Sequence, residues 1–322
     1  MATIWGSGVR ILGCVISGTA EDSSPAQTVA YFRRCDVQGR QEITVANFSI
    51  IRRIALGLAV TAGVFSGALP AEAAETVNVL VLKENGVGTA SQAQGYIDRL
   101  IAQAAKVNGW GAATGKYVTS RSSGEAYMRD SHPSYGFISL AAFLGLRADH
   151  KLEVIGKIEV AQSGGRQYHI ISAKHSDLAG CKGKTLATNH SKDSRFVDRV
   201  VSGGDFKLAD FELVVTRRPL QTIKKVTSGA AECALVDEAQ LEAMKRLDDA
   251  KTLSAVWGSK QLPPMVAVAF ADAPKSERKK FKASLAKICV GDGVVPCKEA
   301  GIKSMKAASA KDYKAVISAY DK

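Results

Sequence analysis

The sequence predicts an α/β protein of two lobes, each built on a mainly parallel sheet flanked by helices. Strand, loop and helix patterns alternate from residue 76 onward, which is the order of elements in α/β folds. The same alternation begins again near residue 184. Two extended stretches, near 158–162 and 260–268, can carry the chain from one lobe to the other and back. We therefore expect the first lobe at 74–160 plus 266–322 and the second lobe at 161–265.

The composition is close to the average of soluble globular proteins. The chain has 322 residues, of which 46% are hydrophobic and 23% are charged. These values exclude a disordered tail and a collagen-like fibre. The 43 Lys and Arg residues against 31 Asp and Glu residues give a net charge of +12. This excess fits a nucleic acid, an anionic membrane surface or a small anionic ligand, and charge alone does not choose among these partners.

Residues 45–73 have the layout of a cleavable secretory signal peptide. A basic pair, Arg52-Arg53, precedes an apolar run over 54–69 and an Ala-x-Ala site that ends at Ala73, where we expect cleavage. The apolar run has 16 residues, fewer than the roughly 20 of a membrane-spanning helix. We therefore expect a protein of the periplasm with no stable membrane anchor after processing.

Residues 1–44, which precede this signal, show no clear apolar periodicity. We interpret them as a non-native or unstructured extension, with translation starting further in. An unusually long first region of the signal peptide is the alternative.

The first lobe begins with a buried strand and a long helix. The β-rich apolar run 76–82 predicts the strand, and a loop follows at Asn85. Apolar residues recur at the helical period over 96–105, and Gly109 ends this helix. The next expected elements are strands at 116–119, 135–138 and 152–160, a loop at 119–124 and a helix at 140–146.

The remaining chain repeats the alternation, and Pro219 fits the first turn of one of its helices. Strands are expected at 168–173, 184–188, 211–215, 233–236, 252–257 and 265–270. Helices are expected at 194–201, 219–228 and 238–247. Three helices with basic faces are expected to close the chain at 275–289, 298–308 and 311–320.

Removal of the leader leaves four cysteines, Cys181, Cys233, Cys289 and Cys297. An even number in an oxidising compartment predicts disulfides. The turn-rich segment between Cys289 and Cys297 can bring these two together, so we pair them and, by exclusion, Cys181 with Cys233. Buried free thiols are the alternative. A zinc site is disfavoured because no Cys-x-x-Cys spacing occurs.

Three segments resemble the type 2 periplasmic solute-binding proteins. Residues 177–187, Asp-Leu-Ala-Gly-Cys-Lys-Gly-Lys-Thr-Leu-Ala, resemble the start of the second lobe in this family. Residues 223–237 are similar to a later stretch of the same lobe. Residues 135–143, Tyr-Gly-Phe-Ile-Ser-Leu-Ala-Ala-Phe, resemble the strand and helix of the first lobe that touch the ligand in the phosphate and phosphonate binders. The resemblance extends over nearly all of 75–322 and implies the two-lobed type 2 periplasmic binding protein fold.

The resemblance also implies a function outside the cytoplasm. A protein of this family captures a small anion, here phosphate or phosphonate-like, in a cleft between the lobes for the permease of an ABC transporter. A secreted sensor or partner-binding lobe of the same fold is the alternative. We expect no cofactor, no metal and no enzymatic activity.

The ligand of such an architecture lies where strands end and helices begin. Free backbone N–H groups and the helix dipole at these positions favour an anion. Four loops there are rich in hydroxyl and amide side chains, and Arg121 can form a bidentate contact with an oxyanion. The candidate ligand-binding residues are Asn85, Thr119, Ser120, Arg121, Ser122, Ser139, Asn189, His190, Ser191, Ser194 and Asp237.

Several of these residues also fit ordinary structural roles. Ser139 and Ser194 fit the N-caps of helices. Asp237 fits either a helix cap or an acceptor for a ligand hydroxyl or a protonated phosphonate. His190 either contacts the ligand or lies in a surface loop.

Enzymatic and nucleic-acid functions have little support in the sequence. The motifs G-x-S-x-G, H-E-x-x-H and G-x-G-x-x-G are absent. A small hydrolase built from Ser139, His190 and Asp237 is the remaining enzymatic alternative, although no motif brings these side chains together. Nucleic-acid binding lacks interleaved aromatic residues and a recognisable module, and export disfavours it.

Overall fold

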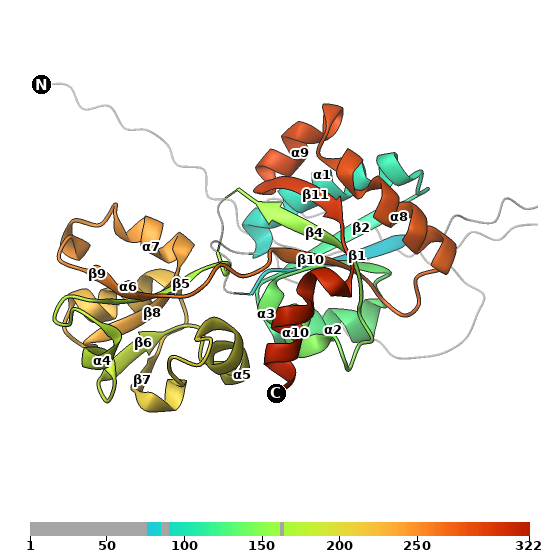
Figure 1. Ribbon diagram of the computed structural model, residues 1–322. Coiled ribbons are helices and arrows are strands. Elements are labelled where there is room, and N and C mark those ends of the chain that lie inside the picture. Colours follow the sequence, from blue (N-terminus) through green and yellow to red (C-terminus); the bar gives the residue numbers. More distant parts are fainter. Residues whose placement is uncertain (1–75, 85–89, 162–163) are drawn as a thin grey trace, which may run out of the picture. The chain divides into compact units, whose positions relative to one another are not determined.

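The structure, a computed structural model, describes residues 76–84, 90–161 and 164–322. The predicted extension 1–44 and signal peptide 45–73 lie outside the described residues. Two sheets form the centres of two lobes, and the chain passes between them after residue 160 and again after residue 258 (Figure 1). No helix in the described part of the chain is long and apolar enough to cross a membrane.

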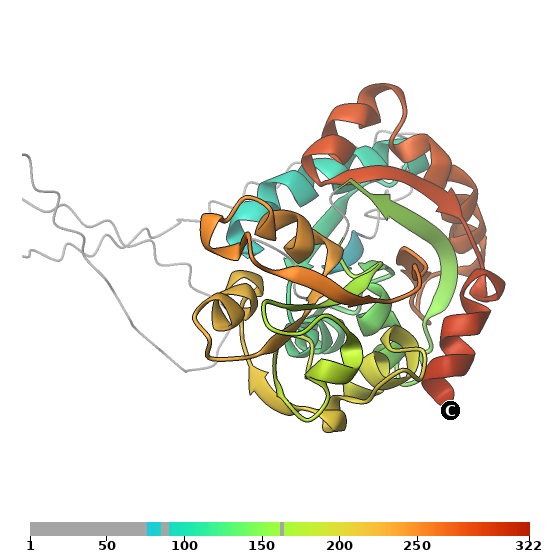
Figure 2. The same cartoon turned by 60° about the vertical axis from the view of Figure 1, so that its left-hand side comes forward.

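The first lobe is built on a mixed sheet of six strands. They are β1 (Val77–Leu82), β2 (Ala113–Val118), β3 (Tyr135–Ile138), β4 (Glu153–Val160), β10 (Met265–Ala269) and β11 (Ile302–Ala307). Their order in the sheet is β11-β4-β10-β3-β1-β2. β1 is parallel to β2 and β3, whereas β10 is antiparallel to β3 and β4, and β11 is antiparallel to β4. Figure 2 shows β11 beside β4 at the edge of this sheet.

Helices cover both faces of this sheet. They are α1 (Ala90–Asn108), α2 (Arg121–Ser131), α3 (Leu140–Leu146), α8 (Lys275–Ile288), α9 (Val294–Glu299) and α10 (Lys314–Asp321). In Figure 1, α1, α8 and α9 lie on one side of the sheet, and α2, α3 and α10 lie on the other. The apolar run of β1 follows from this arrangement, because Val79 and Val81 pack in one core cluster while Leu80 and Leu82 pack in another.

The second lobe is built on a mixed sheet of five strands. They are β5 (Tyr168–Ser172), β6 (Thr185–Thr188), β7 (Glu212–Val215), β8 (Cys233–Asp237) and β9 (Ser254–Gly258), in the order β7-β6-β8-β5-β9. β6 is parallel to β7 and β8, and β5 is antiparallel to β8 and β9. The accompanying helices are α4 (Leu178–Cys181), α5 (Ser194–Phe196), a π-helical turn at Val197–Val201, α6 (Pro219–Thr227) and α7 (Glu238–Met244).

The predicted α/β class is confirmed, but the sheets are less parallel than we expected. Parallel pairs occur where a helix connects one strand to the next, as in β1-α1-β2. Other strands run antiparallel to their neighbours, as β10 does when the chain returns from the second sheet. No crossover helix connects β10 to its neighbours β3 and β4, so nothing requires it to run parallel to them.

Two predicted elements of the first lobe were wrong. The expected helix at 298–308 is the strand β11, preceded by the shorter helix α9. Ile302 and Met305 have helical spacing, but Gly301 has a φ of 71°, which ends α9, and the following residues pair with β4. The expected loop at 119–124 contains the start of α2, whose few apolar residues give it little helical pattern.

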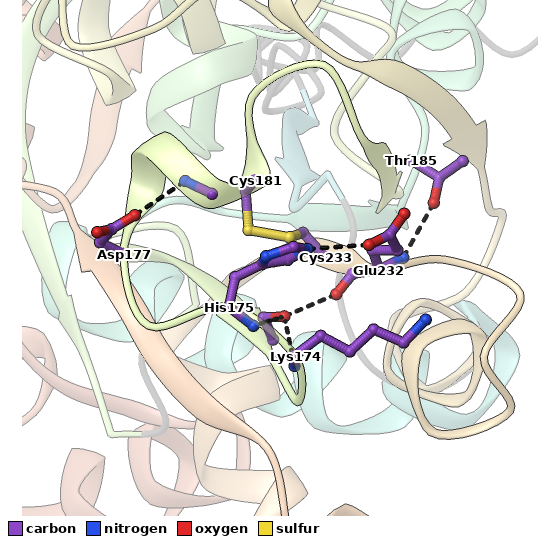
Figure 3. Close-up of a disulfide and its surroundings, with 9 residues drawn as sticks. Lys174, His175, Asp177, Cys181, Thr185, Glu232 and Cys233 are labelled. Carbon is purple, nitrogen blue, oxygen red and sulfur yellow. Dashed lines mark hydrogen bonds and ion pairs between the residues drawn. A yellow bond between two sulfur atoms is a disulfide. The ribbon is translucent and has the colours of Figure 1, made fainter.

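Two disulfides cross-link the described part of the chain. Cys181 and Cys233 join α4 to β8 within the second lobe, with Cα atoms 6.1 Å apart. Figure 3 shows this disulfide beside the hydrogen bond between His175 and Glu232, whose Nε2 and Oε2 atoms are 2.9 Å apart. The second disulfide joins Cys289 at the end of α8 to Cys297 in α9, with Cα atoms 5.5 Å apart.

Candidate functional site

A cavity of about 610 Å³ lies at the carboxyl ends of strands from both sheets. On the first lobe, its wall includes Lys83 after β1, Thr119 after β2 and Ser139 after β3. On the second lobe, it includes Asn189 after β6 and Asp237 at the end of β8. This is the position in which α/β sheets bind their ligands.

The cavity brings most of the predicted ligand-binding residues together. Those in its wall are Thr119, Ser120, Arg121, Ser122, Ser139, Asn189, His190 and Asp237. Ser191 and Ser194 are not in the wall, and Asn85 lies outside the described residues. Ser194 is the exposed first residue of α5, and the cap of that helix is Asp193, whose Oδ1 accepts from the N–H of Phe196 at 2.9 Å.

The first turn of α2 lies in the cavity wall, because Ser120, Arg121 and Ser122 all line it. Ser120 is the N-cap, and its Oγ accepts from the backbone N–H of Ser123 at 3.3 Å. α2 has 11 residues, so its start carries the partial positive charge of a helix N-terminus. This end of the cavity therefore favours negative charge.

Ser139 connects the ends of two neighbouring strands. It precedes α3 but makes no side-chain cap bond there. Its Oγ instead accepts from the backbone N–H of Glu84 at 3.3 Å. The hydroxyl thus ties the end of β3 to the residue pair that follows β1.

Arg121 is held by two carboxylates of the cavity wall. Its Nε and Nη2 donate to Oε1 and Oε2 of Glu84 at 2.9 and 2.8 Å, and its Nη1 lies 2.9 Å from Oδ2 of Asp193. The bidentate partner of this guanidinium is therefore Glu84, where the sequence had suggested an oxyanion ligand. Two negative charges balance its positive charge, so Arg121 contributes little net attraction for an anion.

Lys83 is a cavity residue that sequence reasoning missed. It follows the buried strand β1, and among the described residues no carboxylate forms an ion pair with its ammonium. Burial lowers the pKa of Lys83, and the charges of Asp237 and Glu238 oppose this shift. Its position directly after a buried strand, two residues before the expected binding loop at Asn85, is the signal that could have identified it.

Asp237 has the helix-capping role that its sequence position suggested, and it also lies in the cavity wall. Its Oδ1 accepts from the N–H of Gln240 at 2.9 Å, and the Oε1 of Gln240 accepts from the N–H of Asp237 at 3.0 Å, so the pair forms a capping box for α7. The carboxyl is also part of the cavity wall and is 7% exposed. Burial raises its pKa, and the charge of His190 opposes the shift.

His190 lies in the protein interior and not in a surface loop. It is 8% exposed, and its ring meets that of Tyr168 edge to face with centroids 5.1 Å apart. Its Nε2 lies 3.1 Å from Oε1 of Gln240. Because this oxygen can only accept, Nε2 carries the proton.

Most charged groups of the cavity wall are paired, and those without an ion pair in the described chain are two lysines and the buried carboxyl of Asp237. Arg166 is paired with Glu159 at 2.6 Å, and Glu299 is paired with Arg99 at 2.7 Å. The lining cations without such a pair in the described chain are Lys83 and Lys192. No cluster of metal-ligating side chains occurs among the residues that the structure describes.

Solved structures share this fold. XAC2383 from Xanthomonas citri bound to a chloride ion has a TM-score of 0.60 at 12% identity, with 76% of this chain and 97% of that chain covered. PhnD1 from Prochlorococcus marinus in complex with methylphosphonate has a TM-score of 0.57 at 12% identity, with 75% and 95% covered. The chain has the type 2 periplasmic binding protein fold.

A third structure with this fold is a binding protein component of an ABC phosphonate transporter from Pseudomonas aeruginosa. It has a TM-score of 0.55 at 11% identity, and the match covers 76% of this chain and 87% of that chain. No protein-family model matches the sequence, and no curated protein matches it either. The likeness is therefore one of fold, and the function has to be argued from the residues of the cavity.

Proposed function

We propose that the protein is an extracytoplasmic solute-binding protein that captures a small anion, phosphate or phosphonate-like, for an ABC transporter permease. The signal peptide at 45–73 would export the chain to the periplasm. The lobes would be 74–160 plus 266–322 and 161–265, with the ligand in the cavity between them.

The observation that carries this proposal is the chemistry of the cavity wall at the strand ends. The helix start of α2, the hydroxyls of Thr119 and Ser139 and the ammonium of Lys83 are all in the wall. Hydroxyl and ammonium groups donate hydrogen bonds to oxyanions. The presence of these donors in the wall of one cavity favours an anion over an apolar ligand.

The structural neighbours support the same class of ligand. Methylphosphonate is the ligand named for PhnD1 of Prochlorococcus marinus, and an ABC phosphonate transporter is named for the protein of Pseudomonas aeruginosa. At 11–12% identity these names suggest which ligands to test first.

Recognition in this proposal needs no covalent chemistry. The anion would be held by donors from both lobes, and movement of the lobes toward each other would enclose it. The contact between Arg121 of the first lobe and Asp193 of the second would stabilise the enclosed arrangement.

A thermal-shift screen of the purified chain tests the proposal. The ligands are phosphate, methylphosphonate, sulfate, methanesulfonate and acetate. A true ligand at about 100 times its Kd should stabilise the protein by about 2.7 kcal/mol, which moves the Tm measurably. If no anion shifts the transition and the protein hydrolyses an ester, the binding function is wrong and the hydrolase alternative gains support.

A further inference from the structure

The inference concerns Asn189 and rests on the proposed function. In the described chain, two buried side-chain atoms lack a hydrogen-bond partner, Oη of Tyr135 and Nδ2 of Asn189. Tyr135 is not in the wall of the cavity, whereas Asn189 is. Asn189 is only 6% exposed. A buried amide nitrogen without an acceptor is destabilising, so its presence in a residue of the cavity wall needs an explanation.

The orientation of the neighbouring Gln240 is fixed by the backbone. Its Oε1 accepts from the N–H of Asp237 at 3.0 Å, and its Nε2 donates to the carbonyl oxygen of Pro219 at 3.0 Å. If the amide of Gln240 were flipped, its NH₂ group would face the N–H of Asp237, and its oxygen would face the carbonyl oxygen of Pro219. The backbone of two different elements therefore determines which atom of Gln240 is the nitrogen.

Gln240 in turn fixes Asn189. Nε2 of Gln240 donates to Oδ1 of Asn189 at 3.1 Å, and the hydroxyl of Thr222 donates to the same oxygen at 3.2 Å. Two donors converge on this atom, so it must be the amide oxygen. Nδ2 is then the polar atom of the Asn189 side chain that has no partner in the described chain, in a residue that lines the cavity.

We infer that Nδ2 of Asn189 is a specificity-determining donor that recognises an oxygen atom of the bound anion. The network of Gln240 and Thr222 holds this donor in place before the ligand arrives, which reduces the entropy lost on binding. An oxyanion satisfies the donor, whereas a ligand that presents an ammonium or a methyl group there leaves it without a partner. The class of ligand selected is an oxyanion, such as a phosphonate, a phosphate or a sulfonate.

The variant Asn189→Asp tests this inference. The aspartate retains an oxygen for Gln240 and Thr222 and replaces the donor by a second oxygen. We expect the affinity for the anion that binds the wild-type chain, measured by calorimetry with methylphosphonate, phosphate and sulfate, to fall at least about tenfold. Asn78→Asp is the matched control, because Asn78 is bonded to Ser131 and Thr114 and does not line the cavity. Its affinity should equal that of the wild type.

A measurement on the wild-type chain guards against a variant that fails to fold. In ¹⁵N-resolved NMR spectra, the side-chain amide protons of Asn189 should shift downfield when the anion is added, and those of Asn78 should not. If the wild type binds an anion while N189D binds it equally well, or the Asn189 protons do not shift, the inference is wrong and the proposed function stands. If the wild type binds none of the anions, the proposed function fails and the inference fails with it.

Discussion

Arg121 and Asp193 form an ion pair that joins the two lobes, with Nη1 and Oδ2 2.9 Å apart. Arg121 begins α2 of the first lobe, and Asp193 caps α5 beside the second sheet. The hydroxyl of Tyr320 in α10 also donates to Asp193, at 3.2 Å. Asp193 thus connects an element near each sheet with the C-terminal helix, and the ion pair is well shielded because its side chains are 26% and 12% exposed.

Asp193→Asn should therefore weaken the connection between the lobes. The amide retains an oxygen for the cap of α5 and loses the charge that faces Arg121. We expect the free energy of unfolding to fall by about 1–3 kcal/mol, because a hydrogen bond between charged groups is lost. Urea denaturation measures this change. Glu242→Gln is the control: its pair with Lys245 is 60–65% exposed, so solvent screens the two charges and the loss of stability should be much smaller. Equal losses in both variants would contradict a special role for Asp193.

Lys83→Met should reduce anion affinity more than the same change at Lys192. Both lysines line the cavity without an ion pair in the described chain, but Lys83 is partly buried and Lys192 is exposed. We expect K83M to weaken the binding of methylphosphonate or phosphate by about 10- to 100-fold, because a charge-assisted bond is lost. K192M should have less than about a fivefold effect because solvent screens its charge. Calorimetry measures both, and a larger effect of K192M would rule out Lys83 as the main cation of the site.

The sequence predicted the class of fold because its signals are local. The apolar run of β1 and the helical period of α1 each reflect burial by neighbouring elements, and both elements lie where we expected them. The direction of β11, and whether residues 298–308 form a helix or a strand, depend on pairing with β4, which is about 150 residues away in the sequence. A pattern read along the chain contains no information on that partner.

In the candidate site too, local sequence signals were predictive and contacts between distant residues were not. Thr119, Ser139 and Asn189, which follow strands in the sequence, lie in the cavity wall, and their contact with a ligand stays a prediction. The partners that decide what these residues can do were not predictable. Gln240 donates to Asn189, which is 51 positions away in the sequence. Glu84 binds the guanidinium of Arg121, which we had assigned to the ligand. Such contacts arise only when separate elements pack together.

Asp237→Asn should stabilise the ligand-free protein at neutral pH. Burial raises the pKa of Asp237, so the folded state binds its proton more tightly than the unfolded state does. The free energy of unfolding therefore decreases as the pH rises from about 4 through the raised pKa, and this loss is complete above it. Asparagine retains the oxygen that caps α7 and does not ionise.

Urea denaturation at pH 4 and pH 7.5 measures this effect. The difference in stability between D237N and the wild type should be small at pH 4 and should favour the variant at pH 7.5. Asp177→Asn is the matched control, since Asp177 caps α4 through a bond from the N–H of Gly180 at 2.8 Å but lies on the surface. If D177N gave the same gain at pH 7.5, burial of Asp237 would not be the cause.

The two disulfides should contribute unequally to stability. Cys181–Cys233 closes a loop with a sequence separation of 52, and Cys289–Cys297 one of 8. In the chain-entropy description these loops correspond to about 4 and about 2.5 kcal/mol. Denaturation of C181S/C233S and C289S/C297S should show the larger loss for the first pair. Neither pair of cysteines lines the cavity, so anion affinity should persist in both variants. A larger loss for the second pair would mean that local packing around α9, where Cys297 is 2% exposed, outweighs loop closure.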